Sequence, residues 1–344
     1  MQIRRHPFPR ALILLLLTAA CSAERKSAPV AGYEVTELRY LSSLGNVTFA
    51  ELGEELGYLA PLKLKWVGTV LGGPEAIQAV STGDIDFGTA ATGSVIKVIA
   101  AGAPLKQVIA GSGIDDLTWG GYFVLEDSPL RSARDLIGKK IGVNTLGAHA
   151  EFMIREYLRR GGLSLQEIKD VTMVVTPAIN SEQTLRQRHI DVASLSGVFR
   201  DRARERGGLR PLFSDLGLFG HFNSTTVVFN REALAKRPNA VRKFVESTAR
   251  AIEWARSTPQ AEVRERMAAL LAKRGRGEDP TLSRHWHSVG ISSRGGLLSD
   301  RDMQIWVDWL AREGYLDASK VGKLSALYTN DFNPYRDVAA RAER

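Results

Sequence analysis

Hydrophobic positions follow two alternating patterns from residue 35 onward. Short runs rich in β-branched residues predict strands, and segments with apolar residues every three or four positions predict helices. The first set of strands is expected at 35–41, 62–67, 85–88 and 107–110, and the helices between them at 48–59, 74–81 and 94–101. Strands separated by helices of this size favour right-handed βαβ units and a mostly parallel sheet.

A second set repeats this pattern, with strands predicted at 140–143, 171–175 and 192–195 and helices at 149–160 and 181–187. Ile85-Asp86 and Ile190-Asp191 each open a strand that follows a short helix. Two α/β units with the same pattern predict two similar lobes that face each other. Because ligands of open α/β sheets bind beyond the carboxyl ends of the strands, we expect the two lobes to share a cleft.

Two further β-rich segments, 119–125 and 222–230, are interpreted as connections between the lobes that form a double hinge. After residue 230 the pattern is helical, and the predicted helices pack around the first lobe at 240–256, 260–273, 300–313 and 319–326. The expected fold class is therefore α/β and two-lobed, with a hinge of two crossing segments and a C-terminal helical region. The predicted boundaries are 33–120 with 222–335 for lobe 1, 121–221 for lobe 2 and 336–344 for a tail.

The N-terminal twenty residues have the layout of a bacterial secretory signal, in which Arg4, Arg5 and Arg10 accompany a short apolar run at 11–20. Cys21 follows small residues, as in the lipobox of bacterial lipoproteins, whose cysteine is lipidated. We expect a periplasmic protein anchored to the inner membrane through lipidated Cys21, with 21–32 as a tether. A plain secretory signal remains the alternative.

Composition excludes several classes of function. The 344 residues are 44% hydrophobic, which suits two domains with sizeable cores. The single cysteine excludes an intramolecular disulfide framework and multi-cysteine metal sites, and no P-loop or G-x-G-x-x-G motif occurs. The net charge of +8 would suit nucleic acid, but an exported chain seldom meets any, so the basic stretch 231–276 is interpreted as a solvated helical face. We expect no cofactor, no metal and no nucleic-acid partner.

Small polar residues and glycines gather at the predicted strand ends. Backbone N–H groups at a helix start suit an anion, and hydroxyls add donors without bulk. Individually, a loop serine or threonine is as readily a turn or helix cap as a ligand contact. The candidate ligand-binding residues at the strand ends are Ser42, Ser43, Asn46, Gly72, Gly73, Thr89, Thr92, Ser112, Thr145, Ala148, Asn180, Ser196 and Asn223.

Larger side chains complete the predicted site. His149 could supply one more hydrogen-bond donor at the start of the 149–160 helix. Trp119, Tyr122 and Phe222 lie near the predicted hinge and could pack on an organic tail, although Trp119 is equally compatible with hinge packing. The predicted ligand is therefore a sulfonate, carboxylate or similar oxyanion, held without a full counter-charge.

An ordered series of segments resembles the nitrate-, sulfonate- and taurine-type solute-binding proteins of bacterial ABC importers, the NMT1/THI5-like family. The first-lobe stretch is Gly83-Asp84-Ile85-Asp86-Phe87-Gly88 followed by Ala101-Gly102-Ala103-Pro104-Leu105-Lys106. Residues 135–143 resemble the family's entrance into its second lobe, and 145–149 its ligand loop, with 161–163 and 190–193 continuing the series. The loop 89–93 departs from the commoner sequence of the family, which leaves the exact ligand open.

The resemblance implies a type II periplasmic-binding-protein fold and a non-enzymatic function. A monomer would capture a small, anionic, sulfonate-like solute between its lobes and deliver it to a membrane permease with its ATPase. Contacts from both lobes would favour the closed form. Two alternatives remain: an enzyme like the pyrimidine synthase of the thiamine pathway, and a solute receptor for a signalling partner.

Overall fold

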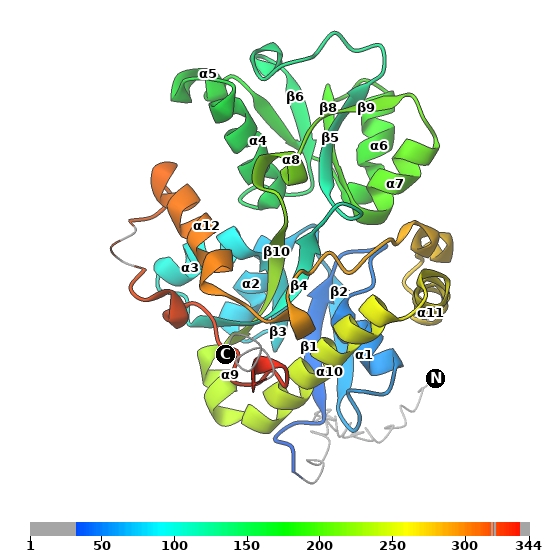
Figure 1. Cartoon of the computed structure of the whole chain (residues 1–344), viewed down its shortest axis with the longest axis vertical. Helices are drawn as coiled ribbons and strands as arrows, with labels where there is room; N and C mark the ends of the chain where they lie inside the picture. The colour runs from blue at the N-terminus through cyan, green and yellow to red at the C-terminus, as the bar shows by residue number, and fades with distance from the viewer. Residues whose placement is uncertain (1–31, 318, 320, 338–344) are drawn as a thin grey trace, which may run out of the picture.

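Two lobes stand one above the other in Figure 1, with β10, the end of β4 and α12 between them. The structure is a computed structural model that describes residues 32–317, 319 and 321–337. The predicted signal, Cys21, nearly all of the tether and most of the tail lie outside the described residues.

The lower lobe contains two small sheets. β1 (Glu37–Ser42) pairs in parallel with β2 (Lys63–Thr69). β10 (Phe222–Asn230) lies between β3 (Phe87–Ala91) and β4 (Leu105–Ile114) and runs antiparallel to both. The helices that link these strands are α1 (Phe49–Glu55), α2 (Gly73–Thr82) and α3 (Thr92–Ala100).

The upper lobe is built on one five-stranded sheet of order β7-β6-β8-β5-β9. Its strands are β5 (Gly120–Leu125), β6 (Lys140–Val143), β7 (Thr172–Val175), β8 (Val192–Ser196) and β9 (Leu209–Ser214). Its helices are α4 (His149–Arg160), α5 (Leu165–Lys169), α6 (Ala178–Arg186), α7 (Gly197–Glu205) and α8 (Asp215–Phe219). The pairs β6–β7 and β6–β8 are parallel, whereas β5 is antiparallel to β8 and β9.

β10, β5 and β9 are antiparallel to their neighbours, so the sheets are less parallel than predicted, and the two segments expected as connections are strands within the sheets. β10 is buried along most of its length and pairs with a strand on each side. The chain returns to the lower lobe from the upper one, and β10 accordingly runs opposite to β3 and β4.

The C-terminal region is helical, as predicted, up to residue 312. Its helices are α9 (Arg231–Lys236), α10 (Pro238–Ser257), α11 (Gln260–Lys273) and α12 (Asp300–Arg312). The helix predicted at 319–326 is wrong for the described part of that segment, which forms a short 3-10 turn at Leu324–Ala326. Gly322 has φ +67°, a left-handed conformation that interrupts a right-handed helix.

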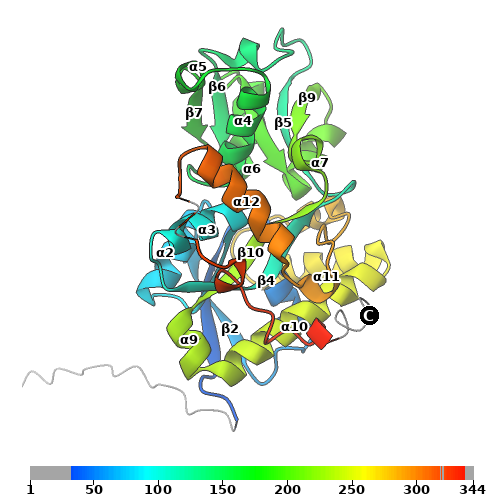
Figure 2. The ribbon, with the colours of Figure 1, turned by 60° about the vertical axis from the view of Figure 1, so that its left-hand side comes forward.

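Helix α12 runs obliquely between the two lobes (Figure 2) and packs on α3 of the lower lobe. Trp306 and Trp309 of α12 are each 1% exposed. The indole Nε1 of Trp309 donates to Glu156 Oε2 of α4 over 3.1 Å, and Arg312 donates to the same oxygen over 2.7 Å. The C-terminal region is thereby attached to both lobes.

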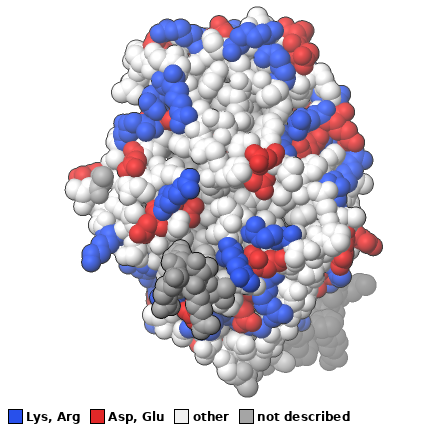
Figure 3. All heavy atoms as spheres, viewed as in Figure 1, with Lys and Arg blue, Asp and Glu red and all other residues white. Residues whose placement is uncertain are grey.

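Positive and negative side chains are interspersed on the face shown in Figure 3, around an uncharged area in its upper centre. This face carries no continuous basic area of the kind that binds a polyanion. The net charge of +8 is thus not concentrated on this side of the molecule.

Candidate functional site

Loops from the two lobes meet where the strands of each lobe end. A Cβ added to Gly72, just before α2, would lie 2.3 Å from Thr145 Cγ2 in the loop after β6. Asn144 Nδ2 donates to the Leu71 carbonyl over 3.0 Å, and Ser94 Oγ donates to the Gly147 carbonyl over 2.7 Å. The structure therefore brings the predicted residues Gly72 and Thr145 together across the cleft.

A second contact closes the cleft beside β1. A Cβ on Gly45 would lie 2.9 Å from the ring of Phe199 at the start of α7. A small hollow of about 50 Å³ lies next to this contact, and its walls include Asn46, Val47, Val198 and Trp286. Asn46, a predicted site residue, is therefore at the edge of an inter-lobe hollow.

Hydroxyl groups form a cluster on the β3–β10–β4 sheet. Ser112 Oγ lies 3.0 Å from Ser224 Oγ and 2.8 Å from Thr225 Oγ1. The methyl group of Thr89 lies beside them, because a Cβ on Gly111 would be 2.8 Å from both Thr89 Cγ2 and Thr225 Oγ1. The sequence analysis selected Ser112 and Thr89 but missed Ser224 and Thr225. The run Ser224-Thr225-Thr226 inside a predicted strand was the available signal.

The N-terminus of α3 adjoins this cluster and has no side-chain cap. Thr92, Gly93 and Ser94 are buried there, so their backbone N–H groups are withdrawn from bulk water. Thr92 Oγ1 is 3.4 Å from the Asn223 carbonyl, and the side chain of Asn223, 1% exposed, has an Oδ1 with no hydrogen-bond partner. An uncapped helix start beside an unpartnered amide is suited to a small polar ligand.

The start of α4 differs from that of α3. Ala148 precedes it without a side-chain cap, but Glu151 in the first turn accepts from the Gly147 N–H over 2.8 Å. A carboxylate already occupies this end of the helix, and it disfavours a second anion close by. Of the two helix starts expected to hold an oxyanion, α3 is therefore the better suited.

His149 binds a buried acid that the sequence analysis did not select. Its Nε2 lies 2.9 Å from Asp215 Oδ2, and Asp215 is fully buried. Oδ1 of Asp215 also accepts from the N–H groups of Gly120 and Leu216, at 2.8 and 2.7 Å. The imidazole is thus oriented by an acid from α8, some sixty positions away in the chain, which no local motif indicates.

The loop that contains Ser42, Ser43 and Asn46 is held by buried charges. Arg276 donates to Ser42 Oγ over 3.0 Å, and Arg274 to the Asn46 carbonyl over 2.8 Å. Both arginines also pair with Glu51, at 2.9 and 3.0 Å. The three charged side chains are each less than 10% exposed. The prediction that the basic stretch 231–276 is a solvated face is therefore wrong at its end, because these arginines neutralise buried carboxylates.

The phenol of Tyr40 belongs to the same network. It donates to Glu51 Oε1 over 2.7 Å and accepts from Arg276 over 2.7 Å. Burial and the neighbouring Glu51 carboxylate raise the pKa of Tyr40, so the phenol remains a donor. The Arg276 guanidinium also lies 4.5 Å from the ring centroid of Trp66.

Several other predicted residues do not join the inter-lobe contacts. Tyr122 is 1% exposed; its OH donates to the Ala150 carbonyl over 3.1 Å, and its ring stacks on Phe213. Tyr122 is therefore a core residue of the upper lobe in this structure. Asn180 and Ser196 are exposed at the starts of α6 and α7, and neither caps its helix with its side chain. Gly73 packs on Ala90, and Ala148 is buried.

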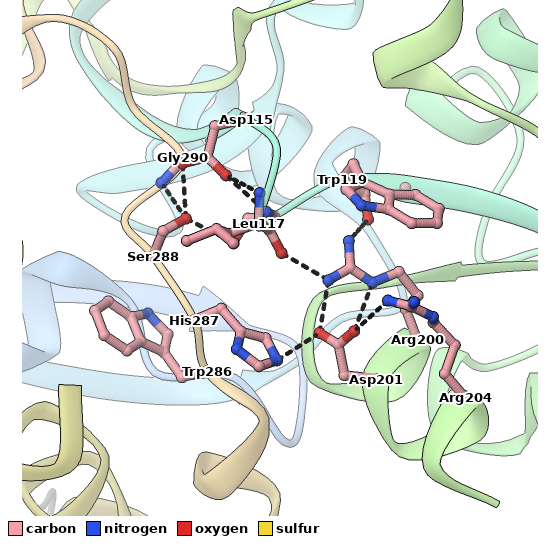
Figure 4. Close-up of polar contacts among 12 residues, drawn as sticks. Asp115, Leu117, Trp119, Arg200, Asp201, Arg204, Trp286, His287, Ser288 and Gly290 are labelled. Atoms are coloured by element: carbon pink, nitrogen blue, oxygen red, sulfur yellow. Dashed lines mark hydrogen bonds and ion pairs between the residues drawn. The ribbon is translucent and has the colours of Figure 1, made fainter.

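Trp119 lies at a crossing between the lobes (Figure 4). Arg200 of α7 donates to the carbonyls of Trp119 and Leu117, over 2.9 and 2.7 Å. Its guanidinium also lies 4.3 Å from the ring centroid of Trp119 and pairs with Asp201 at 2.7 Å. His287 contacts Asp201 at 3.5 Å. Of the two roles predicted for Trp119, these contacts fit packing at the hinge and not packing on a ligand.

Comparisons with known proteins agree with this architecture. Residues 52–262, more than half of the chain, match the family profile described as NMT1/THI5 like. The chain belongs to the NMT1/THI5-like family. An Escherichia coli (strain K12) protein named for the binding of aliphatic sulfonates is 27% identical over 215 residues. That match covers 61% of this chain and 62% of the relative, so the chain spans less than two thirds of that protein's length.

Solved structures show the fold. The periplasmic nitrate-binding protein NrtA from Synechocystis PCC 6803 superposes with a TM-score of 0.66 at 15% identity, covering 90% of each chain. The desulfurization enzyme DSZB superposes with a TM-score of 0.57 at 16% identity, covering 89% of this chain and 99% of the enzyme. The predicted α/β, two-lobed fold of periplasmic binding proteins is confirmed. Among the described residues, none of the helices has the length and apolar character needed to span a membrane.

Proposed function

We propose that this member of the NMT1/THI5-like family is the extracytoplasmic solute-binding component of an ABC importer. One observation carries the proposal: loops at the strand ends of both lobes touch at Gly72 and Thr145, directly beside the polar groups of β3, β10 and β4. A solute bound there contacts both lobes and therefore favours the closed arrangement. We take 33–120 with 222–335 as lobe 1 and 121–221 as lobe 2.

The proposed solute is a small organic anion, with sulfonates as the leading class. Two features support it: the uncapped start of α3, and the hydroxyls of Ser112 and Thr225. Neutral donors of this kind bind an oxyanion without a buried counter-charge. The sulfonate-binding relative supports the same class.

Calorimetry tests the proposal most directly. Purified mature protein is titrated with ethanesulfonate, nitrate and benzoate, and small-angle scattering is recorded with each ligand. We expect micromolar binding, about −8 kcal/mol, of at least ethanesulfonate, with compaction on binding. Thr92→Val and Asn223→Leu should each weaken it, whereas Asn180→Leu serves as an exposed control. Absence of heat with every ligand, or turnover of a ligand, would contradict the proposal; turnover would favour an enzyme, as in DSZB.

Localisation and partners are proposed on the same basis. The protein is secreted, lipidated at Cys21, held at the inner membrane as a monomer, and delivers solute to a permease with its ATPase. The apolar run 11–20 followed by Cys21 supports this, as does the periplasmic location of the nitrate-binding neighbour. Cys21→Ser should move the protein from the membrane to the soluble periplasmic fraction. An unchanged distribution would favour the plain secretory signal.

A further inference from the structure

Two buried ring nitrogens without a hydrogen-bond partner occur in one aromatic cluster at the lobe junction. They are Nδ1 of His149 in the upper lobe and Nε1 of Trp306 in α12. Buried polar atoms are nearly always hydrogen-bonded, so an unpartnered pair in adjacent rings calls for an explanation. The other tryptophan of α12, Trp309, illustrates the usual case, since its Nε1 donates to Glu156.

The two rings are direct neighbours. Their centroids are 6.1 Å apart with an interplanar angle of 68°, and each ring lies about 6 Å from that of Phe222, at 5.9 Å for His149 and 6.1 Å for Trp306. Trp306 also faces the start of α3, because a Cβ on Gly93 would lie 2.7 Å from its ring. The Trp306 ring therefore adjoins the helix start that we propose holds the anion, and the His149 ring lies beside it.

Their hydrogen-bonding characters are opposite. The Asp215 carboxylate accepts the hydrogen bonds of two backbone N–H groups, and Nε2 of His149 lies 2.9 Å from its other oxygen. A carboxylate accepts only, so Nε2 donates to Asp215, and in an imidazole that carries this one proton Nδ1 is an acceptor. Indole Nε1 is a donor only. A single group that accepts a hydrogen bond from Trp306 Nε1 and donates one to His149 Nδ1 therefore satisfies both nitrogens.

We propose that the solute carries a hydroxyl group that binds between Trp306 Nε1 and His149 Nδ1. This inference rests on the proposed function and narrows its ligand class to hydroxylated organic anions. A hydroxyl accepts and donates at once. An ammonium group donates but cannot accept from the indole, and a methyl group does neither. The order of preference at this position is therefore hydroxyl, then ammonium, then methyl.

Three ligands that differ only at this position provide the test: 2-hydroxyethanesulfonate, 2-aminoethanesulfonate and ethanesulfonate. Calorimetry should show that the hydroxylated ligand binds about five-fold more tightly than ethanesulfonate, the gain typical of a net hydrogen bond. Equal affinities would overturn the hydroxyl site but leave the solute-binding function intact. No binding of any of the three would overturn both.

Trp306→Phe keeps an aromatic ring and removes the donor, so it should abolish the preference for the hydroxyl. Trp309→Phe is the matched control in the same helix and should keep it. If Trp306→Phe does not fold, the indole ¹H–¹⁵N resonance of Trp306 in the unmodified protein decides. It should shift with 2-hydroxyethanesulfonate and not with ethanesulfonate. The same shift with both ligands, or with neither, would overturn the assignment.

Discussion

Two loops at the cleft, one from each lobe, are held in place by different forces. The lower-lobe loop at 42–47 is fixed by buried ion pairs between Arg274, Arg276 and Glu51. The upper-lobe loop at 144–148 is held by separate hydrogen bonds and not by buried ion pairs. Two of these bonds, from Asn144 to Leu71 and from Ser94 to Gly147, join it to the other lobe. The comparison indicates that the lower loop is formed before the lobes meet, whereas the upper loop is completed by their contact.

The largest expected effect comes from removing a charge that fixes the lower loop. Arg274→Met removes the arginine that pairs with buried Glu278 and one of the two arginines that pair with Glu51, so the free energy of unfolding should fall by about 3 kcal/mol in urea titrations. Arg284→Met is the control, because its pair with Glu205 is exposed and should contribute less than about 1 kcal/mol. Equal losses for both variants would show that the lower loop is not held by its buried charges.

The next effect disturbs the contact of the upper loop with Gly72 and leaves the lower loop at 42–47 intact. Gly72→Ala places a methyl group 2.3 Å from Thr145 Cγ2, so solute binding should weaken by about 10- to 100-fold in calorimetry. Gly72 has φ −172°, which alanine adopts, and the melting temperature without ligand should change little. Adding Thr145→Ser, which removes Cγ2, should restore part of the affinity. Unchanged affinity in Gly72→Ala would show that binding does not require this contact.

Glu156 tests whether a buried charge of the upper lobe also affects the cleft. This carboxylate holds α12 and not the cleft loop. Burial alone would raise its pKa, but hydrogen bonds from Arg159 and Arg160 and the charge of Arg312 lower it overall. A lowered pKa contributes stability above the normal glutamate pKa of about 4.3, and this stability is lost as the pH falls through the lowered value.

The destabilisation caused by Glu156→Gln should therefore be full at pH 7 and shrink below about pH 4.3. Urea unfolding at several pH values measures it, with solute affinity at pH 7 unchanged. Glu232→Gln, at an exposed ion pair, is the control. A pH-independent difference would mean that Glu156 is not ionised in the folded protein.

The smallest effect concerns the single hydrogen bond from the upper loop to Leu71 of the lower lobe. Asn144→Ala removes the donor to the Leu71 carbonyl, and solute affinity should fall about three-fold with little change in melting temperature. A loss of stability without a loss of affinity would place Asn144 in the upper lobe alone.

Elements with strong local patterns were predicted well from the sequence. The helices at 149–160 and 260–273 and the strand at 222–230 have the predicted bounds, because their periodicity and flanking residues are local signals. Strand β9 was missed. It contains Pro211, which a sequence pattern reads as a break, but β9 is an edge strand, where a proline is tolerated.

The candidate site was predictable only in part. The pattern of glycines and hydroxyls at strand ends selected Gly72 and Thr145 as separate site candidates, and the structure brings the two together. The partners that orient those residues come from distant segments: Asp215 for His149, and Arg276 for Ser42. Tyr122 was assigned to the ligand because an aromatic residue near a hinge resembles a cleft residue, whereas strand β5 directs it into the core.

The attachment of α12 to Glu156 has a consequence for how the lobes separate. A rotation that preserves the contacts of Trp309 and Arg312 with Glu156 has its axis close to α12. Displacements then grow with distance from that axis, and α7 lies on the opposite side of the molecule in Figure 1. The gap between Gly45 and Phe199 would accordingly widen more than the gap between Ser94 and Gly147, so under the proposed function the solute would enter and leave on the α7 side.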